Sequence, residues 1–523
     1  MGLFNRTANT NDAPAETGLS VVAPDAPRAN SHAKPPRKQN FLTRAISDWC
    51  ARLLGVINNR SFHDEQDYGS HRTTLDYVWN TVGFTAWGMV FPLLTMVVTQ
   101  LAGVDQAGRF SMAFVVASLL MILANFGIRT YQVSDVQERH SFTEYQLNRL
   151  ITCLAMMVVG HLYCTIRGYD ANMMSMCFAV FAYRMVDGLA DVYEGRLQQK
   201  DKLYLAGISL SVRSLLAFVA FCLGLLVTGN LVVASAAMAI VALACFCFVT
   251  FPLAKLETPK SGPSSAQGVF ELFKHCWPLF VALFMYALID NMPKFMMEGV
   301  LTYDNQLYFN ALYFPAQTIL MMVGFVYKPQ LVTMTNAWND ASKHKRFDLF
   351  IVVMVLLIVL VTVVVALVMA WIGIPLMSLL YGIDFEQFRG LCYVMLAAGG
   401  VTGIIDFLYQ VITILRKQQV VMKLYLITFA FSLFVPVLLI NFTGLPGAVL
   451  SYLIVMSILA VLLAWEYLKV RIGFSREGAE PVQPANDQPA QPQATPQEPA
   501  APRQLREAPQ PRRPRSEPRS RTK

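Results

Sequence analysis

The chain has 523 residues, of which 55% are hydrophobic and only 15% are charged, and its mean hydropathy is +0.44. Soluble proteins usually carry about 25% charged residues, so this composition excludes a soluble enzyme, a collagen-like fibre and a disulfide-rich scaffold. Apolar runs of about 20 residues recur along the sequence, and this length is the one needed to cross a bilayer as a helix. We therefore predict an all-α polytopic membrane protein.

The two ends of the chain differ from its middle. Residues 1–72 and 473–523 lack apolar periodicity and together hold 16 of the 27 prolines, so we predict disordered cytoplasmic tails. Within the first tail, apolar residues at helical spacing predict an amphipathic helix over about 41–57, which lies in the membrane interface or packs on the membrane domain. The basic stretch 511–515 predicts contact with anionic lipid headgroups or an acidic partner, or is a solvated end of the tail.

Twelve membrane spans are predicted between the tails. Apolar windows bounded by charges and helix breakers place them at 77–101, 109–128, 147–166, 171–193, 203–227, 230–251, 273–297, 307–327, 348–374, 389–415, 421–443 and 446–470. Loops after the even-numbered spans hold 16 Lys and Arg residues, whereas loops after the odd-numbered spans hold three, Arg109, Arg167 and Arg389. Because basic loops stay on the cytoplasmic side, this alternation predicts a multi-pass protein of the cytoplasmic membrane with both termini cytoplasmic.

A polar stretch rich in Pro, Gly and Ser separates the first six predicted spans from the last six. We therefore predict an N-lobe over 73–254, a cytoplasmic linker over 255–270 and a C-lobe over 271–472. Two six-helix lobes around a central cavity would suit alternating access by rocking.

Motifs for catalysis are missing from the sequence. It has no Gly-Lys dipeptide of a P-loop and no HExxH, CxxC or GxSxG pattern. Eight of the nine cysteines fall in predicted spans, where we interpret them as small apolar residues rather than metal ligands. We predict that the protein is not an enzyme and that it uses no cofactor, no metal ion and no nucleic acid.

Charged side chains inside the spans are the informative residues, since inserting each one costs about 2.5–3.5 kcal/mol unless it is paired or hydrated. The candidate substrate-binding cations are Arg184, Arg213 and Lys294. The candidate coupling or pairing acids are Asp187, Asp290 and Asp406.

Helical spacing leaves two interpretations of these charges open. Either they line a polar cavity that attracts an anionic group, or they neutralise one another in pairs, Arg184 with Asp187 and Asp290 with Lys294. Two further acids, Asp191 and Glu194, share the helical face of Asp187 but lie near the cytoplasmic end of their span, and we interpret them as interfacial.

Short motifs stand at the ends of several spans. In chain order they are Asn80-Thr81-Val82-Gly83, Asn125-Phe126-Gly127-Ile128-Arg129, Gln146-Leu147-Asn148-Arg149, the stretch from Asp187 to Gln199, Asp290-Asn291-Met292-Pro293-Lys294, Tyr308-Phe309-Asn310-Ala311, Lys328-Pro329-Gln330 and Leu380-Tyr381-Gly382. Their order and the number of spans resemble bacterial Wzx-type oligosaccharide flippases. These are polysaccharide transporters of the multidrug/oligosaccharidyl-lipid/polysaccharide (MOP) exporter superfamily.

The resemblance implies a flippase that moves a polyprenyl-diphosphate-linked oligosaccharide across the cytoplasmic membrane by alternating access. The surface polysaccharide would be a capsule, an exopolysaccharide, an O-antigen or a cell-wall glycan. The implied partners are the lipid-linked oligosaccharide, membrane lipids and H⁺ or Na⁺ as a coupling ion. Other polysaccharide-assembly proteins are candidate partners of the basic C-terminal tail.

Two other functions compete with this one. A cation-coupled multidrug or small-molecule exporter of the same superfamily would need acids facing a cationic drug, whereas the embedded charge here is mixed. A membrane glycosyltransferase or polymerase would need a large outer loop or a soluble domain, and the longest predicted outer loop, 375–388, is short. The related lipid II flippases carry arginines deep in their first, second and eighth helices. Spans one and eight here have none, which argues against that subset.

Overall fold

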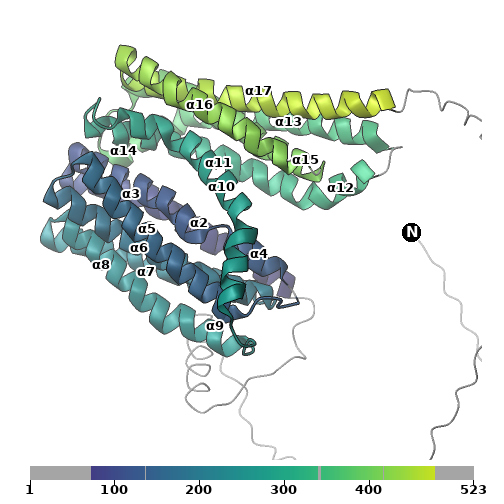
Figure 1. Ribbon diagram of the computed structural model, residues 1–523. Coiled ribbons are helices and arrows are strands. Elements are labelled where there is room, and N and C mark those ends of the chain that lie inside the picture. Colours follow the sequence, from purple (N-terminus) through teal and green to yellow (C-terminus); the bar gives the residue numbers. More distant parts are fainter. Residues whose placement is uncertain (1–71, 136, 340–342, 416, 478–523) are drawn as a thin grey trace, which may run out of the picture. The chain divides into compact units, whose positions relative to one another are not determined.

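The computed structural model describes residues 72–135, 137–339, 343–415 and 417–477. Its α-helices are α2 (Arg72–Ala102), α3 (Val104–Asn125), α4 (Ile128–Ser134), α5 (Phe142–Arg167), α6 (Ala171–Gln199), α7 (Leu203–Thr228), α8 (Leu231–Cys245), α9 (Phe251–Glu257), α10 (Ala266–Met297), α11 (Tyr303–Tyr327), α12 (Leu331–Asn339), α13 (His344–Val368), α14 (Ile374–Tyr381), α15 (Arg389–Ile414), α16 (Gln418–Thr443) and α17 (Leu445–Glu477) (Figure 1). Two π-helical turns, η1 (Phe246–Thr250) and η4 (Met369–Gly373), and two 3₁₀ turns, η2 (Lys328–Gln330) and η5 (Glu386–Phe388), join some of them. The described residues form no β-strand.

Twelve helical stretches are long and apolar enough to cross a membrane, and they coincide with the twelve predicted spans. The ninth stretch, His344–Tyr381, is longer than predicted because η4 joins α13 to α14 without a break. The prediction of an all-α polytopic membrane protein is thereby confirmed. The amphipathic helix expected over 41–57 lies outside the described residues. So do the expected tails, except that α2 begins at Arg72 and α17 runs to Glu477.

The chain forms two compact units. Among the described residues, the first unit contains 72–90 and 123–277, and the second unit contains 91–122 and those from 278 to 477. The segment 91–122 therefore groups with the second unit, although its spans were counted into the predicted N-lobe. The division into six plus six spans remains a prediction.

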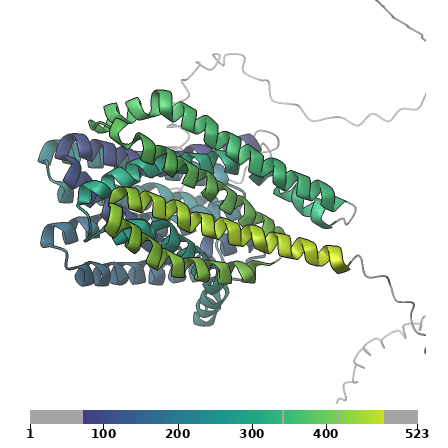
Figure 2. The ribbon, with the colours of Figure 1, turned by 90° about the horizontal axis from the view of Figure 1, so that it is seen from above.

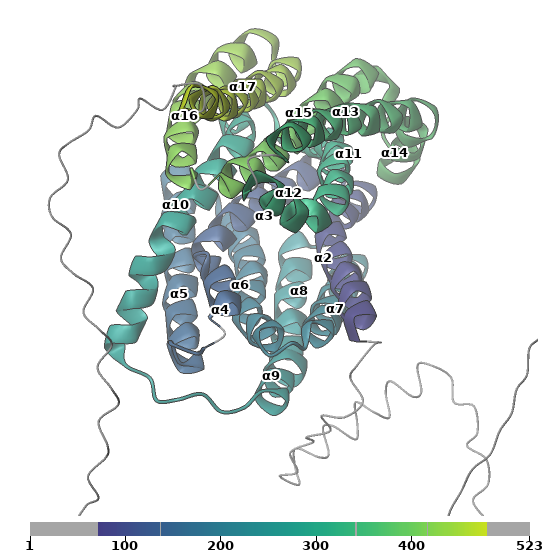
Figure 3. The same cartoon turned by 90° about the vertical axis from the view of Figure 1, so that its right-hand side faces the viewer.

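In the first unit, α6 is the central helix. α4, α5, α7 and α8 all pack against it, as Figure 3 shows. At the contact of α2 with α7, glycine is required by space, because a Cβ at Gly207 would lie 2.3 Å from the carbonyl oxygen of Trp79. Gly83, one turn further along α2, faces Gly207 in the same way. Small residues of this kind allow two membrane helices to approach closely.

In the second unit, α15 packs against α11, α13 and α17, and α16 lies along α17, the yellow helix of Figure 2. The segment 91–122 joins this unit through side-chain contacts. The rings of Phe91 and Phe114 stack with centroids 4.3 Å apart, and Asn310 Nδ2 donates to Ser111 Oγ at 2.9 Å. A Cβ at Gly399 would lie 2.7 Å from the carbonyl oxygen of Ala316, so α15 and α11 are also in close contact.

The contact of α2 with α7 can be tested by Gly207→Ala. The new Cβ would meet backbone atoms that belong to a packed helix, so we expect a loss of about 1–3 kcal/mol of stability, as in other overpacked sites. The measurement is the melting temperature of the purified protein in detergent. Gly88→Ala is the matched control, because a Cβ there has no atom within 4 Å. Equal melting of the two variants would contradict the close contact.

Candidate functional site

The candidate site in the first unit is built on one face of α6. Asp187, Asp191 and Glu194 recur there at steps of four and three residues, which places their carboxylates on the same side of the helix. Four arginines meet these three acids, from α4, α5, α6 itself and α7: Arg129, Arg149, Arg184 and Arg213. The cluster thus contains one more positive than negative charge.

Asp187 is held by three donors. Its Oδ1 accepts a hydrogen bond from Arg213 Nε at 3.0 Å. Its Oδ2 accepts from Trp87 Nε1 at 3.0 Å and from Arg184 Nη1 at 3.2 Å. The Arg184 guanidinium also lies over the Trp87 ring, 4.8 Å from its centroid. Asp187 is only 2% exposed, and these donors replace the water that it would otherwise bind.

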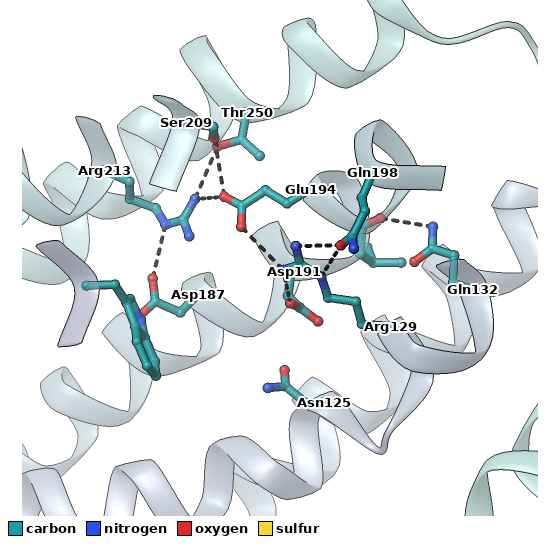
Figure 4. Close-up of polar contacts among 12 residues, drawn as sticks. Asn125, Arg129, Gln132, Asp187, Asp191, Glu194, Gln198, Ser209, Arg213 and Thr250 are labelled. Atoms are coloured by element: carbon teal, nitrogen blue, oxygen red, sulfur yellow. Dashed lines mark hydrogen bonds and ion pairs between the residues drawn. The ribbon is translucent and has the colours of Figure 1, made fainter. Parts of the chain in front are cut away.

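Arg213 connects Asp187 to Glu194, as Figure 4 shows. Arg213 Nη1 donates to Glu194 Oε1 at 2.7 Å, and Ser209 Oγ donates to the same oxygen at 3.3 Å. Thr250, in the π-helical turn η1, lies with its Oγ1 3.4 Å from Arg213 Nη1. Glu194, which we interpreted as interfacial, is therefore buried within the protein.

Asp191 is held by two arginines that sequence analysis assigned to loops. Arg129 Nη1 donates to Asp191 Oδ1 at 2.8 Å, and Arg149 Nη2 donates to Asp191 Oδ2 at 2.7 Å. Gln198 Oε1 accepts from both Nε and Nη2 of Arg129 (Figure 4). Arg149 is fully buried. These contacts tie α4 and α5 to α6.

A break in the second span positions Arg129 and Arg149. Phe126 and Gly127 both have a positive φ, 48° and 69°, which ends α3 and starts α4 in another direction. At the break, the carbonyl oxygen of Ala124 accepts from Arg149 Nη1 at 2.8 Å, and the same Nη1 donates to Asn125 Oδ1 at 2.8 Å. The motif that contains Asn125 and Arg129 therefore supplies a helix break, one ligand of Arg149 and one cation of the cluster.

The second unit holds a different arrangement around Asp290 and Lys294 of α10. Asp290 accepts hydrogen bonds from two tyrosines, Tyr313 OH at 2.6 Å and Tyr452 OH at 2.7 Å. Lys294 Nζ donates to Asn291 Oδ1 at 2.9 Å and lies over the Tyr313 ring, 3.9 Å from its centroid. Within the described part of the chain, no carboxylate lies within 4.0 Å of the Lys294 ammonium.

The structure thus places the predicted site residues in three groups. In the first unit, Arg184 forms an ion pair with Asp187, and Arg213, for which no partner was predicted, binds the same carboxylate. Asp290 and Lys294 lie on one helix but do not form the ion pair that their spacing suggested. Asp406, on α15, accepts a short hydrogen bond from Tyr327 OH. No group of three or more metal-ligating side chains in the described residues is arranged to hold a metal ion.

Sequence reasoning missed several members of both clusters: Trp87, Arg129, Arg149, Tyr313 and Tyr452. The two arginines were counted as loop residues that set the topology. Their motifs were noted for resemblance, but no spacing rule connects them to α6.

Comparison with known proteins finds a family model that matches just under half of the chain and solved structures that share the fold of most of it. Residues 79–334 match the model of a family described as polysaccharide biosynthesis protein. A multidrug resistance MATE family transporter of the MOP superfamily is 12% identical with a TM-score of 0.58, covering 76% of this chain and 99% of that one. The lipid II flippase MurJ is 11% identical with a TM-score of 0.56, covering 75% of this chain and 87% of that one.

A further MOP superfamily transporter, from Pyrococcus furiosus, is 12% identical with a TM-score of 0.52, covering 76% of this chain and 95% of that one. No curated protein matches the chain. At such low identity the solved structures establish the fold, which is that of MOP superfamily transporters. Together with the matched family, this confirms the resemblance predicted from the sequence.

The ion pairs of Arg213 can be tested by Arg213→Gln. This variant leaves Asp187 and Glu194 buried without their main cation, so we expect a loss of about 3–5 kcal/mol of stability. Adding Asp187→Asn should restore part of it, because one uncompensated carboxylate is removed. Melting in detergent measures both effects. Arg109→Gln is the control, since its pair with Asp105 is exposed and such pairs contribute about 0–1 kcal/mol. Equal melting temperatures of Arg213→Gln and Arg109→Gln would show that the ion pairs of Arg213 do not stabilise the helix packing.

Proposed function

We propose that this protein is a flippase. Two findings support the proposal: the chain has the fold of MOP transporters, and residues 79–334 match the polysaccharide biosynthesis protein family. Its substrate is a polyprenyl-diphosphate-linked oligosaccharide, moved across the cytoplasmic membrane by alternating access for surface polysaccharide biosynthesis. The 16-to-3 distribution of basic residues between alternate loops supports cytoplasmic termini.

The burial of the Lys294 ammonium is the observation on which the proposal rests. Lys294 is 3% exposed, and among the described residues its ammonium contacts an amide oxygen and aromatic ring faces rather than a carboxylate. Burying a cation without a counter-charge is costly. A diphosphate would supply the missing negative charge, and lysine is a common phosphate ligand.

Amide groups surround the same part of α10. Gln306 Nε2 donates to the carbonyl oxygen of Lys294 at 2.6 Å, and Asn310 Nδ2 donates to Ser111 Oγ at 2.9 Å. Both amide side chains are buried, and their oxygens accept no hydrogen bond from the part of the chain that the structure describes. Amide oxygens and tyrosine rings are the groups that bind sugar hydroxyls and sugar faces, so this cluster suits a phosphosugar better than an apolar drug.

The other two predicted cations have another role in this proposal. Arg213 is bonded to two carboxylates, and Arg184 to one of them and to the face of Trp87. We assign them to the assembly of the first unit and assign the diphosphate contact to Lys294.

Asp290 is the proposed coupling acid. Both of its oxygens accept hydrogen bonds from tyrosine hydroxyls, whose hydrogens would repel a metal cation. Tyr313, one of these two donors, also lies against Lys294. The arrangement therefore favours H⁺ over Na⁺ as the coupling ion.

Export of cationic drugs is the alternative. It needs a carboxylate that is available to a cationic ligand. Each of these carboxylates already accepts hydrogen bonds within the protein. Asp187 accepts them from three donors, Asp290 from two tyrosine hydroxyls, and Asp406 from the hydroxyl of Tyr327. This geometry supports the flippase.

Deletion of the gene distinguishes the two functions. We expect loss of the surface polysaccharide and accumulation of its lipid-linked oligosaccharide inside the cell, because synthesis continues while translocation stops. The measurements are glycan staining and mass spectrometry of extracted lipids, with a plasmid copy as the complementation control. Normal surface glycan together with increased sensitivity to cationic drugs would instead support the drug exporter.

Lys294→Gln tests the diphosphate contact. Loss of a hydrogen bond to a charged group costs about 1.5–3 kcal/mol, so we expect export to fall by about 10-fold or more while the protein still accumulates in the membrane. Lys294→Arg, which keeps the charge, should retain part of the activity. Lys328→Gln, on an exposed lysine, is the control and should export normally. Normal export by Lys294→Gln would show that this lysine does not bind the substrate.

A further inference from the structure

The linker that follows α9 is docked on the first unit. Ser261 Oγ accepts a hydrogen bond from the backbone N–H of Phe142 at 2.8 Å. The carbonyl oxygen of Pro259 accepts from Arg196 Nη2 at 3.2 Å. Residues 258–265 are therefore hydrogen-bonded to the N-terminal end of α5 and to the C-terminal end of α6, in addition to their covalent connection to α9 and α10.

Glu144 of α5 provides the strongest attachment. Its Oε1 accepts from the backbone N–H of Ser265 at 2.8 Å and from Ser265 Oγ at 3.1 Å. Its Oε2 accepts from the backbone N–H of Ser141 at 3.0 Å and lies 3.3 Å from His140 Nδ1. Both oxygens of one buried carboxylate are thus used, and Ser265 is the residue that immediately precedes α10.

The two serines that bind Glu144 cap two different helices. Ser141 and Glu144 form a reciprocal capping box at the start of α5. Ser265 Oγ accepts from the backbone N–H of Gly268 at 2.9 Å, so it caps the start of α10. A single negative charge therefore lies at the N-terminal ends of both helices, where helix dipoles favour it.

Space around Glu144 is fully used. A Cβ at Gly268 would lie 2.4 Å from Glu144 Oε1, so only glycine allows this approach. Further along α10, His275 stacks on Tyr131 with ring centroids 5.8 Å apart, and Phe273 lies edge-on to Phe126 at 5.3 Å. The first unit ends just beyond these contacts, and Pro278, inside α10, begins the second.

We propose that Glu144 is a latch: it keeps residues 258–277 attached to α5 and α4, and translocation depends on this attachment. The latch itself is a property of the folded chain, and its role in translocation rests on the proposed function. Figure 3 shows the lower part of α10 beside α5, where the latch lies. Glu144 acts through the position of α10 and is a positioning residue rather than a substrate ligand.

Hydrogen exchange of the purified full-length protein tests the latch without any substrate. In Glu144→Gln we expect amide exchange in peptides covering 258–270 to become at least about 10-fold faster, since the charge that holds both helix ends is lost. Peptides of α15 and α17 should be unchanged. Glu271→Gln is the matched control. Glu271 lies on α10, whose start is held by Glu144, but among the described residues its carboxylate accepts a hydrogen bond from the exposed Gln267 alone. Equal exchange in the two variants would overturn the proposal.

Gly268→Ala provides a second variant that keeps the charge. Its Cβ would displace the Glu144 carboxylate, so the same peptides should exchange faster even if Glu144→Gln does not fold. Protected peptides in a folded Gly268→Ala protein would contradict the latch.

Export of the lipid-linked oligosaccharide then tests the role of the latch. We expect Glu144→Gln to export at least about 5-fold less than Glu271→Gln at equal abundance. Faster exchange with unchanged export would overturn the role in translocation. A deletion strain with normal surface glycan would refute the proposed function alone, because the exchange result does not depend on the substrate.

Discussion

The first unit depends on one constraint: the three carboxylates on the buried face of α6 must each meet a cation. A charged side chain in a membrane span is tolerated only when it is paired or hydrated. Here the cations come from α4, α5 and α7, so satisfying α6 also fixes the helices around it. Even the break after Asn125 serves this arrangement, because it frees a carbonyl oxygen for Arg149 and turns Arg129 toward Asp191. The ion pairs of this unit therefore also determine how its helices pack.

The second unit holds its half-buried acids differently. Asp290 and Asp406 are held by neutral tyrosine hydroxyls, whereas Asp187 is held by arginines. The arginines supply a positive charge to each carboxylate of α6, which offsets the cost of burying it. Tyrosine hydroxyls donate hydrogen bonds to Asp290 and Asp406 without supplying a positive charge. Among the described residues, Asp290 and Lys294 are therefore held without an ion pair, unlike the charges of the arginine cluster.

The spans were predictable because hydropathy and charge placement report directly on the membrane. The charged face of α6 was also predictable, since its spacing is local in the sequence. The partners were not. Asp290 and Lys294 lie four residues apart and suggested a pair, but Tyr452 comes from a helix about 160 residues later and takes an oxygen of Asp290 instead. No pattern within a few residues of Asp290 in the sequence predicts a hydrogen-bond donor from so distant a helix. The positive φ of Phe126, which orients the motif around it, is equally invisible to hydropathy.

The uneven distribution of basic residues between alternate loops persists when the residues that form ion pairs are left out of the count. Five of the 16 basic residues assigned to cytoplasmic loops are held in ion pairs within the first unit: Arg129, Arg149, Arg196, Lys200 and Lys202. Two of them, Arg149 and Arg196, are almost fully buried. Arg196 and Lys200 both bind Glu138. Burial alone would raise the pKa of Glu138, but hydrogen bonds from these two cations lower it below its usual value. Structural arginines of this kind inflate a count of loop charges. Without these five, eleven basic residues still face three in the alternate loops, so the bias does not depend on the residues that form ion pairs.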